Sequence, residues 1–511
     1  MTAAGFIRCG HRAVEDLFDA LADPRRGESW MPLVLLGYAA VWTLYAVIAK
    51  SSQDIHPDMA EMAAWSERLA LGTPKHPPLG SWLLSGWFEV FPRTDWAYYL
   101  FAMLLPAIAL WIAWRISLRY LSPEKCVVGI ALLTLVPFYN FHALKFNANA
   151  VLTPLWAAAT WWFLLSFETR RPGWAVLAGI GAAAAILGKY WSALLVVAFG
   201  LGALIDRRSD AYFRSPAPYI SLAVGTVLLT PHIDWVIAHQ FAPLNYAFEA
   251  HPASYLTAAE SAIGFIGSSV AYIAAPLAFS LIAVQPGLAT IADTLWPSER
   301  DRRFVLFVFA VPFLLAALVA VLFEVRIEAL WAISLMTLLP VVLLSSPMVS
   351  ISRRAGVISL AIAVAAPLIM LVASPVIAIA VHQAGVDNFQ DQYALVAVAL
   401  DEAWQKRTDR PLRIIGSFTS VVNGAAFYIP SKPETFDLYG PALTPWVDDA
   451  DIRSEGMAMI CPESMVPCLQ MLDGYGEHYH AVATEHVSLA RSYLGSRGPS
   501  VPYEIVIIPP R

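Results

Sequence analysis

Long apolar runs constrain this chain more than any other feature of its sequence. Runs close to the roughly 20 residues that a helix needs to cross a bilayer recur through the first three quarters of the 511 residues. Composition agrees, since 58% of the residues are hydrophobic and 14% are charged, against about 25% charged residues in soluble domains. The sequence predicts an α-helical polytopic membrane protein with about 11 spans, near residues 31–50, 95–114, 126–141, 149–167, 173–188, 190–205, 217–236, 262–285, 304–323, 328–346 and 356–381.

Arginine and lysine residues divide unequally between alternate loops of this arrangement. Pairs such as Arg25 with Arg26, Arg170 with Arg171 and Arg353 with Arg354 fall in one set of loops, and the other set holds few basic residues. Positively charged loops remain in the cytoplasm. We therefore expect a multi-pass protein of the bacterial inner membrane, with a cytoplasmic N-terminus and a periplasmic C-terminal region.

The composition changes after about residue 382. Apolar residues have helical spacing over 391–407, and short apolar runs at 411–418, 456–463 and 503–510 indicate buried strands. We predict a membrane module over 1–381 and a small extracytoplasmic α/β domain over 382–511. The stretch "GSFTSVVNG" in this domain resembles a phosphate loop only weakly, so a structural or acceptor-positioning role is favoured.

Two cysteines stand close together in the C-terminal region, in "CPESMVPC". Cys461 and Cys468 can form a disulfide if this region faces an oxidising compartment, and two unpaired thiols are the alternative. The spacing alone leaves both possibilities open.

The first external loop concentrates titratable residues directly after the first apolar run. Asp58 and Glu61 are three residues apart, which places both on one face of a helix. The "HPPL" segment that follows favours an extended chain, and "LGSWLLSGWFEVF" then predicts an amphipathic return. For any single residue the alternative is a solvated loop with ordinary charges. An active site at the bilayer surface, however, requires such a carboxylate beside cationic groups.

Three segments resemble a known superfamily. "DMAEMAAWSERLALGTPKHPPLGSWLL", "LKFNANAVLTPLWA" and "GKYW" are similar to the GT-C glycosyltransferases. Within these, they resemble relatives of the protein O-mannosyltransferases, of the lipid A aminoarabinose transferase and of the rhizobial lipopolysaccharide galacturonosyltransferases. The resemblance implies a GT-C-like fold and transfer of a sugar, with inversion, from a polyprenyl-phosphate donor to an extracytoplasmic acceptor. That acceptor would be lipid A, lipopolysaccharide core, another lipid or a protein.

The resemblance also implies roles for individual residues. Asp58 matches an acidic residue that acts as catalytic base or positions the acceptor. Lys75 and His76 match a Glu-Lys pair that contacts the donor phosphate or a metal, and Lys189 and His251 match two further external residues. The acidic member of the pair is missing here, which weakens the case for a metal.

The chemistry of the reaction leads to the same residues. A departing phosphate requires cations, and the acceptor hydroxyl requires a carboxylate that takes its proton. Asp58 is the preferred base and Glu61 the second candidate, because a helix start keeps a carboxylate ionised.

The external cations available for the donor phosphate are Lys75, His76, Lys189, His251 and Arg326. Alternatives remain for each of these cations. Lys189 could extend to the interface, Arg326 could pair with a neighbouring glutamate, and His251 could be a simple loop residue.

Other ligands and other protein classes are alternatives to this interpretation. Asp54, His56 and Asp58 alternate closely, so a divalent cation is conceivable, but their spacing matches no recognised metal site. A net charge of −6 argues against a nucleic-acid partner, so the expected partners are the lipid-linked donor, a lipid or glycolipid acceptor and membrane lipids. A polytopic transporter or flippase and an O-antigen ligase are the alternative functions.

Overall fold

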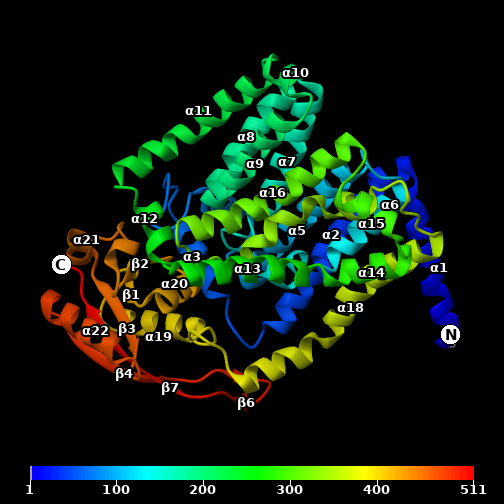
Figure 1. Cartoon of the computed structure of the whole chain (residues 1–511). Helices are drawn as coiled ribbons and strands as arrows, with labels where there is room; N and C mark the ends of the chain where they lie inside the picture. Colours follow the sequence, from blue (N-terminus) through cyan, green and yellow to red (C-terminus); the bar gives the residue numbers. More distant parts are fainter. Residues whose placement is uncertain (1–2) are drawn as a thin grey trace. The chain divides into compact units, whose positions relative to one another are not determined.

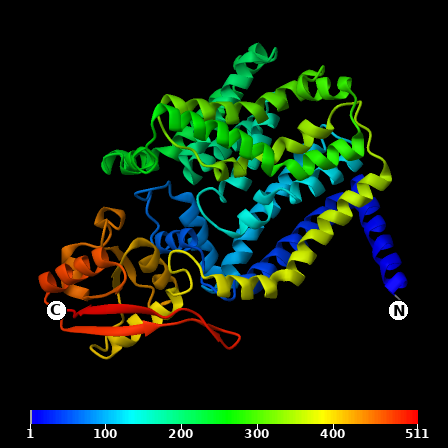
Figure 2. The same ribbon diagram turned by 60° about the horizontal axis from the view of Figure 1, so that its bottom comes forward.

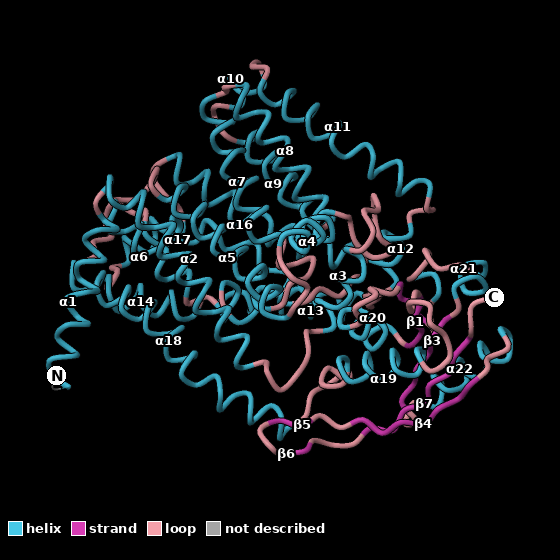
Figure 3. Tube along the Cα trace, turned by 180° about the vertical axis from the view of Figure 1, so that it is seen from behind, coloured by secondary structure: helices cyan, strands magenta, loops and turns pink. Residues whose placement is uncertain are grey.

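The structure, a computed structural model, describes residues 3–511 and is mostly helical. Its contacts divide the chain into two compact units. The first comprises Met1–Thr43, His76–Leu79 and Leu100–Leu371, and the second comprises Leu44–Lys75, Gly80–Tyr99 and Val372–Arg511. All strands described lie in the second unit, toward the C-terminus (Figure 3). The second unit therefore contains the predicted C-terminal domain together with most of the first external loop.

Helices alone build the first unit, apart from an isolated bridge between Pro252 and Val325 in its described part. Several of its helices begin at a proline in the first turn, such as Pro123 after the capping hydroxyl of Ser122. The α-helices are α1 (Ala3–Ala22), α2 (Pro24–Ala49), α5 (Asp95–Ser117), α6 (Pro123–Thr134), α7 (Leu152–Thr169), α8 (Pro172–Gly188), α9 (Ala193–Ile205), α10 (Ser209–Phe213), α11 (Ala217–Ala238), α12 (Ala242–Glu249), α13 (Tyr255–Tyr272), α14 (Ala274–Val284), α15 (Leu288–Leu295), α16 (Arg300–Leu322), α17 (Leu339–Leu344) and α18 (Arg353–Ala384). Short 3₁₀ helices are η1 (Pro137–Tyr139), η2 (Phe141–Leu144), η3 (Tyr190–Ser192) and η4 (Ala329–Leu338). Helices α2, α5 and α18 continue into the second unit.

Each of the 11 predicted spans overlaps helical structure, but not always one continuous helix. Five helices, α2, α5, α11, α16 and α18, are long and apolar enough to cross a membrane, and the number rises to seven if two bent pairs each count as one span. The bent pairs are α6 with the η1–η2 segment, at 81°, and α13 with α14, at 50°. The predicted span near 328–346 consists of η4 followed by α17. A multi-pass helical protein is supported, and the exact number of spans stays a prediction.

Helices α7, α8 and α11 lie side by side in the first unit (Figure 1). Small residues permit this close packing. A Cβ atom on Gly179 of α8 would meet the backbone carbonyl of Ser221 in α11, and one on Gly181 would meet Ala159 in α7. Close contact through small residues is the usual way in which helices associate without an aqueous driving force.

A five-stranded sheet forms the centre of the second unit, in the order β2–β1–β3–β7–β4. β1 is parallel to β2 and β3, whereas β7 is antiparallel to β3 and to β4, with which it forms the long red pair in Figure 2. The strands are β1 (Ile414–Ser417), β2 (Glu434–Asp437), β3 (Met457–Pro462), β4 (Ala483–Leu489), β5 (Ser492–Tyr493), β6 (Ser496–Arg497) and β7 (Val501–Ile508). The helices are α3 (Pro57–Ser66), α4 (Leu79–Val90, whose first residue belongs to the first unit), α19 (Tyr393–Gln405), α20 (Thr419–Tyr428), η5 (Pro441–Leu443), α21 (Asp449–Glu455) and α22 (Val466–Tyr479).

Alternating side chains of the central strands fill two separate cores. Ile415, Ile460 and Ile505 belong to one core, which includes residues of α19 and α20. Ile414 and Met459 belong to the other, which includes residues of α22. Strands buried on both faces appear in a sequence as continuous apolar runs. The predicted strands at β1, β3 and β7 and the predicted helix α19 are therefore confirmed. With a core on each face of the sheet, they belong to a three-layer α/β arrangement.

Glycine allows α20 to pack tightly against α19. A Cβ atom on Gly424 would overlap the ring of Tyr393, which is fully buried. On the other face of the sheet, Cys461 of β3 forms a disulfide with Cys468 of α22, with 5.7 Å between their Cα atoms. Of the two states that the sequence left open for these cysteines, the structure shows the bonded one.

Candidate functional site

Asp58 lies in the first turn of α3, where the sequence predicts the helix to begin. Pro57 occupies the first position, and the backbone N–H of Asp58 donates to Nδ1 of the capping residue His56 over 3.1 Å. The Asp58 carboxylate is 41% exposed and lies 3.5 Å from the same imidazole nitrogen. The local sequence thus holds a partly exposed carboxylate at a helix N-terminus.

Glu61 and Lys75 form a close ion pair. Oε1 of Glu61 lies 2.5 Å from Nζ of Lys75, and both side chains are largely buried. Burial raises the pKa of Glu61, the charge of Lys75 lowers it in part, and the nearby carboxylates of Asp58 and Asp437 raise it further. The second candidate base and the first candidate cation are therefore in contact with each other.

Asp54, in contrast, holds the first external loop in place. Its carboxylate is 2% exposed and lies 2.6 Å from Nη1 of Arg491, and it also accepts the backbone N–H of Ala394 over 3.1 Å. Its own backbone N–H donates to the carbonyl of Gln390, whose side chain donates back to the carbonyl of Asp54. Asp54 therefore anchors the chain four residues before Asp58.

A pocket of about 610 Å³ opens beside α3 within the second unit. This volume is typical of small-molecule sites. The first external loop contributes both candidate bases and Lys75, and the remaining walls come from the C-terminal α/β region. The lining residues are Pro57, Asp58, Glu61, Lys75, Asn388, Phe389, Phe418, Thr419, Ser420, Asn423, Tyr439 and Met465.

The first turn of α20 forms one wall of this pocket. β1 ends at Ser417, and α20 begins two residues later at Thr419, whose hydroxyl hydrogen-bonds the carboxylate of Asp437 at the end of β2. Ligands of open α/β sheets bind outside the carboxyl ends of parallel strands. The stretch that only weakly resembles a phosphate loop therefore lies at a pocket, a placement that its sequence did not establish.

Lys189 has an extended backbone conformation and lies between α8 and η3 in the first unit. Its Nζ donates to Oδ1 of Asn149 over 2.6 Å and lies 4.5 Å from the ring centre of Trp331. An aromatic face attracts a cation in this position. A lysine between two apolar helices is costly without a partner, and here the partners are an amide and an indole.

His251 lies close to the same indole, and Arg326 bonds to the backbone of His251. The imidazole of His251 is 5.5 Å from the Trp331 ring, edge to face, and the backbone N–H of Arg326 donates to the carbonyl of His251 over 3.0 Å. Partial burial lowers the pKa of His251, and the charges of Lys189 and Arg326 lower it further. Arg326 is 60% exposed and lies 3.4 Å from Glu328, as the alternative for this residue anticipated.

His76, the remaining candidate, follows Lys75 directly and is half-buried. Its contacts assign it to the first unit, whereas those of Lys75 assign that residue to the second.

Among the side chains that the structure describes, no group of three or more His, Cys, Asp or Glu residues is arranged to hold a metal ion. In the first external loop, Asp54 does not contribute to such a group, because its carboxylate already bonds Arg491 and a backbone N–H. Asp54, His56 and Asp58, which alternate in the sequence, are therefore not assembled as a cation site.

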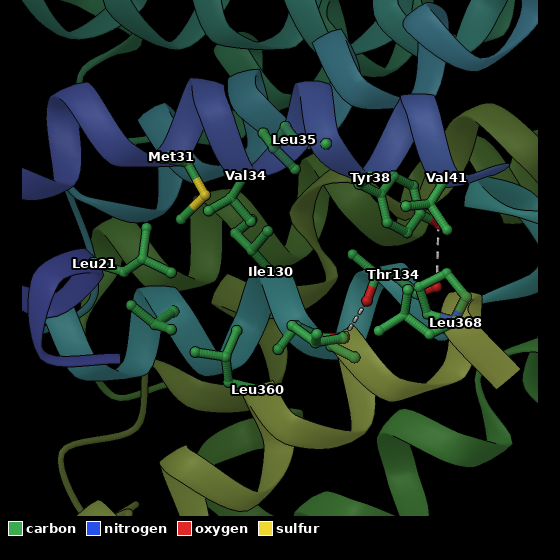
Figure 4. A pocket seen from close by; sticks show the side chains of 16 residues that line it. Leu21, Met31, Val34, Leu35, Tyr38, Val41, Ile130, Thr134, Leu360 and Leu368 are labelled. Atoms are coloured by element: carbon green, nitrogen blue, oxygen red, sulfur yellow. Dashed lines mark hydrogen bonds between the residues drawn. The ribbon is translucent and has the colours of Figure 1, made fainter. Parts of the chain in front are cut away.

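A second cavity, of about 220 Å³, lies between α1, α2, α6 and α18 in the first unit (Figure 4). Its described lining is apolar apart from Tyr38 and Thr134, and Tyr38 donates its hydroxyl hydrogen to the carbonyl of Tyr139 over 2.8 Å. Leu360 and Leu368 of α18 complete the wall. Such a lining contains neither a base nor a cation for phosphate, so the chemistry is assigned elsewhere.

Sequence reasoning missed several residues, both around Lys189 and in the pocket beside α3. No role was predicted for Asn149, Trp331 or Asn423. Trp331 lies in the 3₁₀ segment η4, inside a predicted span, where an aromatic residue carries no distinguishing pattern. The "TSVVNG" segment was the available signal for Asn423.

A family model described as dolichyl-phosphate-mannose-protein mannosyltransferase matches residues 75–235. Two curated relatives come from Rhizobium johnstonii. The lipopolysaccharide core galacturonosyltransferase RgtB is 26% identical over 298 residues, which cover 55% of this chain and 59% of the relative. The lipid A galacturonosyltransferase RgtD is 25% identical over 213 residues, which cover 40% of this chain and 43% of that relative. The chain thus aligns with less than two thirds of either relative.

Two crystal structures of ArnT from Cupriavidus metallidurans share the fold. One is bound to undecaprenyl phosphate, with a TM-score of 0.60 over 93% of this chain and 97% of ArnT, and the other is in the apo state, with a TM-score of 0.59 over 94% and 98%. Sequence identity is 13% in both cases, so this likeness concerns the fold. The predicted GT-C-like fold with a small C-terminal sheet region is confirmed, and the three comparisons together support the resemblance to the GT-C glycosyltransferase superfamily.

Proposed function

We propose that this chain is an integral membrane glycosyltransferase. It moves a sugar from a polyprenyl-phosphate donor to an extracytoplasmic acceptor, which is lipid A, lipopolysaccharide core or another envelope glycolipid. The named activities of the sequence relatives support the transferase class. The observation that carries the proposal is the partly exposed carboxylate of Asp58 at a helix start, lining a polar pocket.

Asp58 is the catalytic base of the proposed reaction. Its carboxylate takes the proton of the acceptor hydroxyl while that oxygen attacks the anomeric carbon of the donor sugar. The bond from the anomeric carbon to the phosphate oxygen breaks, the polyprenyl phosphate leaves with the electron pair, and the configuration inverts. Asp58 suits this role better than its neighbours, because its side chain is 41% exposed, whereas those of Glu61 and Asp54 are 19% and 2% exposed.

The donor phosphate is assigned to cations that stabilise its developing charge. Lys189 is the first choice, because Asn149 and Trp331 hold its ammonium group in a defined position. His251 and Arg326 are the further candidates in the same unit. Lys75 and His76 have the same proposed role on the basis of the family resemblance.

Asp58→Asn tests the base directly. The substitution is nearly isosteric, so turnover of a polyprenyl-phosphate sugar should fall by roughly 10²–10⁴-fold while donor binding is retained. Glu61→Gln is the matched control on the same helix and should reduce turnover less. Near-normal turnover in Asp58→Asn with an inactive Glu61→Gln would instead identify Glu61 as the base.

We further propose that the protein lies in the bacterial inner membrane with its C-terminal region in the periplasm. The distribution of basic residues supports this orientation, and the disulfide between Cys461 and Cys468 fits an oxidising compartment. An alkaline phosphatase fusion after Arg511 should be active in intact cells. A fusion at this position that works only with a cytoplasmic reporter contradicts the orientation.

A further inference from the structure

Asn423 of α20 has a polar side chain that the fold leaves unused. It is 6% exposed and lines the pocket beside Asp58, yet its amide makes no hydrogen bond within the part of the chain that the structure describes. The polar atoms of this amide are not sealed from solvent, so they face the space of the pocket. The amide is therefore suited to a partner that enters the pocket.

The charges around the pocket argue against an anion as this partner. Asp58 and Glu61 line it with one cation, Lys75, which Glu61 already pairs. The helix start of α20 would attract an anion, but its Thr419 hydroxyl already bonds the buried carboxylate of Asp437. Lys75 is the one cation of the described lining, so the α20 side of the pocket offers no cation to a phosphate or carboxylate group.

Polar and apolar surfaces alternate within the pocket in a way that suits a sugar ring. Amide and carboxylate groups can exchange hydrogen bonds with hydroxyl groups. Phe389 and Phe418 pack edge to face at 5.6 Å, and the ring of Tyr439 is 43% exposed. Pockets of this kind bind a ligand by apolar contact and orient it by a few polar groups.

We infer that the α20 wall of this pocket binds the acceptor through a neutral, hydroxyl-bearing saccharide, with Asn423 as a specificity-determining residue. This inference rests on the proposed function, because it identifies the molecule that Asp58 deprotonates. It assigns acceptor recognition to the C-terminal α/β region, whereas the donor phosphate is assigned to cations outside it.

Direct binding tests this inference independently of turnover. The full-length protein in nanodiscs is titrated with lipopolysaccharide core oligosaccharide, in its phosphorylated and its enzymatically dephosphorylated form, and binding is followed by saturation-transfer NMR. The wild type should bind both forms. Asn423→Ala should weaken the binding of each by roughly 3–10-fold, the loss of about one neutral hydrogen bond. Gln405→Ala, on the exposed face of α19, is the control and should bind as the wild type does.

Each remaining outcome decides against the inference or separates it from the proposed function. Equal binding by Asn423→Ala and wild type, binding of the phosphorylated form alone, or no binding by the wild type overturns the saccharide site. Binding that depends on Asn423 without sugar transfer from any polyprenyl-phosphate donor retains the saccharide site and refutes the transferase. Thermal unfolding of Asn423→Ala close to that of the wild type excludes loss of folding as the cause.

Discussion

Removing the carboxylate of Asp54 should markedly lower the temperature at which the second unit unfolds. In Asp54→Ala, Arg491 loses its 2.6 Å partner and the backbone N–H of Ala394 loses its acceptor. Breaking a buried pair by removing one partner costs about 3–5 kcal/mol. Arg491 remains 21% exposed, so water can solvate it in part, and we expect the lower end of the range. A domain of 150–250 residues loses about 2–4 °C per kcal/mol, which corresponds to a decrease in Tm of about 6–12 °C.

The assay is thermal unfolding of the purified protein in detergent, followed by tryptophan fluorescence. Lys406→Ala breaks the exposed pair with Glu485 in the same unit, which contributes at most about 1 kcal/mol, and should change the Tm by no more than about 4 °C. Arg491→Ala and the double variant with Asp54→Ala complete a double-mutant cycle, in which the double variant should lose less than the sum of the single losses. A decrease for Asp54→Ala as small as that of Lys406→Ala, or strictly additive losses, would refute the role of this pair as an anchor.

Three further predictions concern donor binding, pH and the disulfide. Lys189→Ala should lose most turnover of a polyprenyl-phosphate sugar while the protein still inserts and folds, and Asn149→Ala should lose less; unchanged kinetics in Lys189→Ala would make this lysine an interfacial residue. The pKa of His251 is lowered in the folded protein, so neutral His251 contributes stability that is full above its unfolded pKa of about 6.5 and is lost as pH falls below that value. The Tm of the wild type should therefore fall more on acidification than the Tm of His251→Gln. Parallel curves of Tm against pH for the two proteins would contradict this. Mass spectrometry after thiol alkylation without reductant should find Cys461 and Cys468 unmodified, and alkylation of both in protein from intact cells would argue against the disulfide.

Local patterns predicted the parts of the fold that depend on local physics. The apolar runs identified the long apolar helices of the first unit, and the buried strands β1, β3 and β7 were visible because both of their faces are apolar. β4 was missed because its burial alternates along the strand and it lies at the sheet edge. β2 has only four residues, too few for a periodic pattern.

The candidate site was predictable as far as it lies on one short segment. Pro57 and Asp58 identified the start of α3, and the spacing of Asp58 and Glu61 placed both carboxylates at one pocket. Thr419 and Asn423 could not be assigned to that pocket, because more than 300 residues separate them from α3 and only tertiary packing brings the segments together. The pairing of Asp54 with Arg491 has the same origin, and it distinguishes an anchoring carboxylate from the proposed base.

The close approach of α19 and α20 at Gly424 has an evolutionary consequence. Any side chain at this position would overlap the buried ring of Tyr393 and displace α20 from α19. Asn423 immediately precedes this glycine, so such a displacement would also move the amide that lines the pocket. At the proposed acceptor site, descendant sequences can therefore exchange the pocket side chains of α20 and acquire new acceptors, while selection should preserve glycine at position 424. Substrate preference can then diverge on a backbone that one neighbouring residue keeps in register.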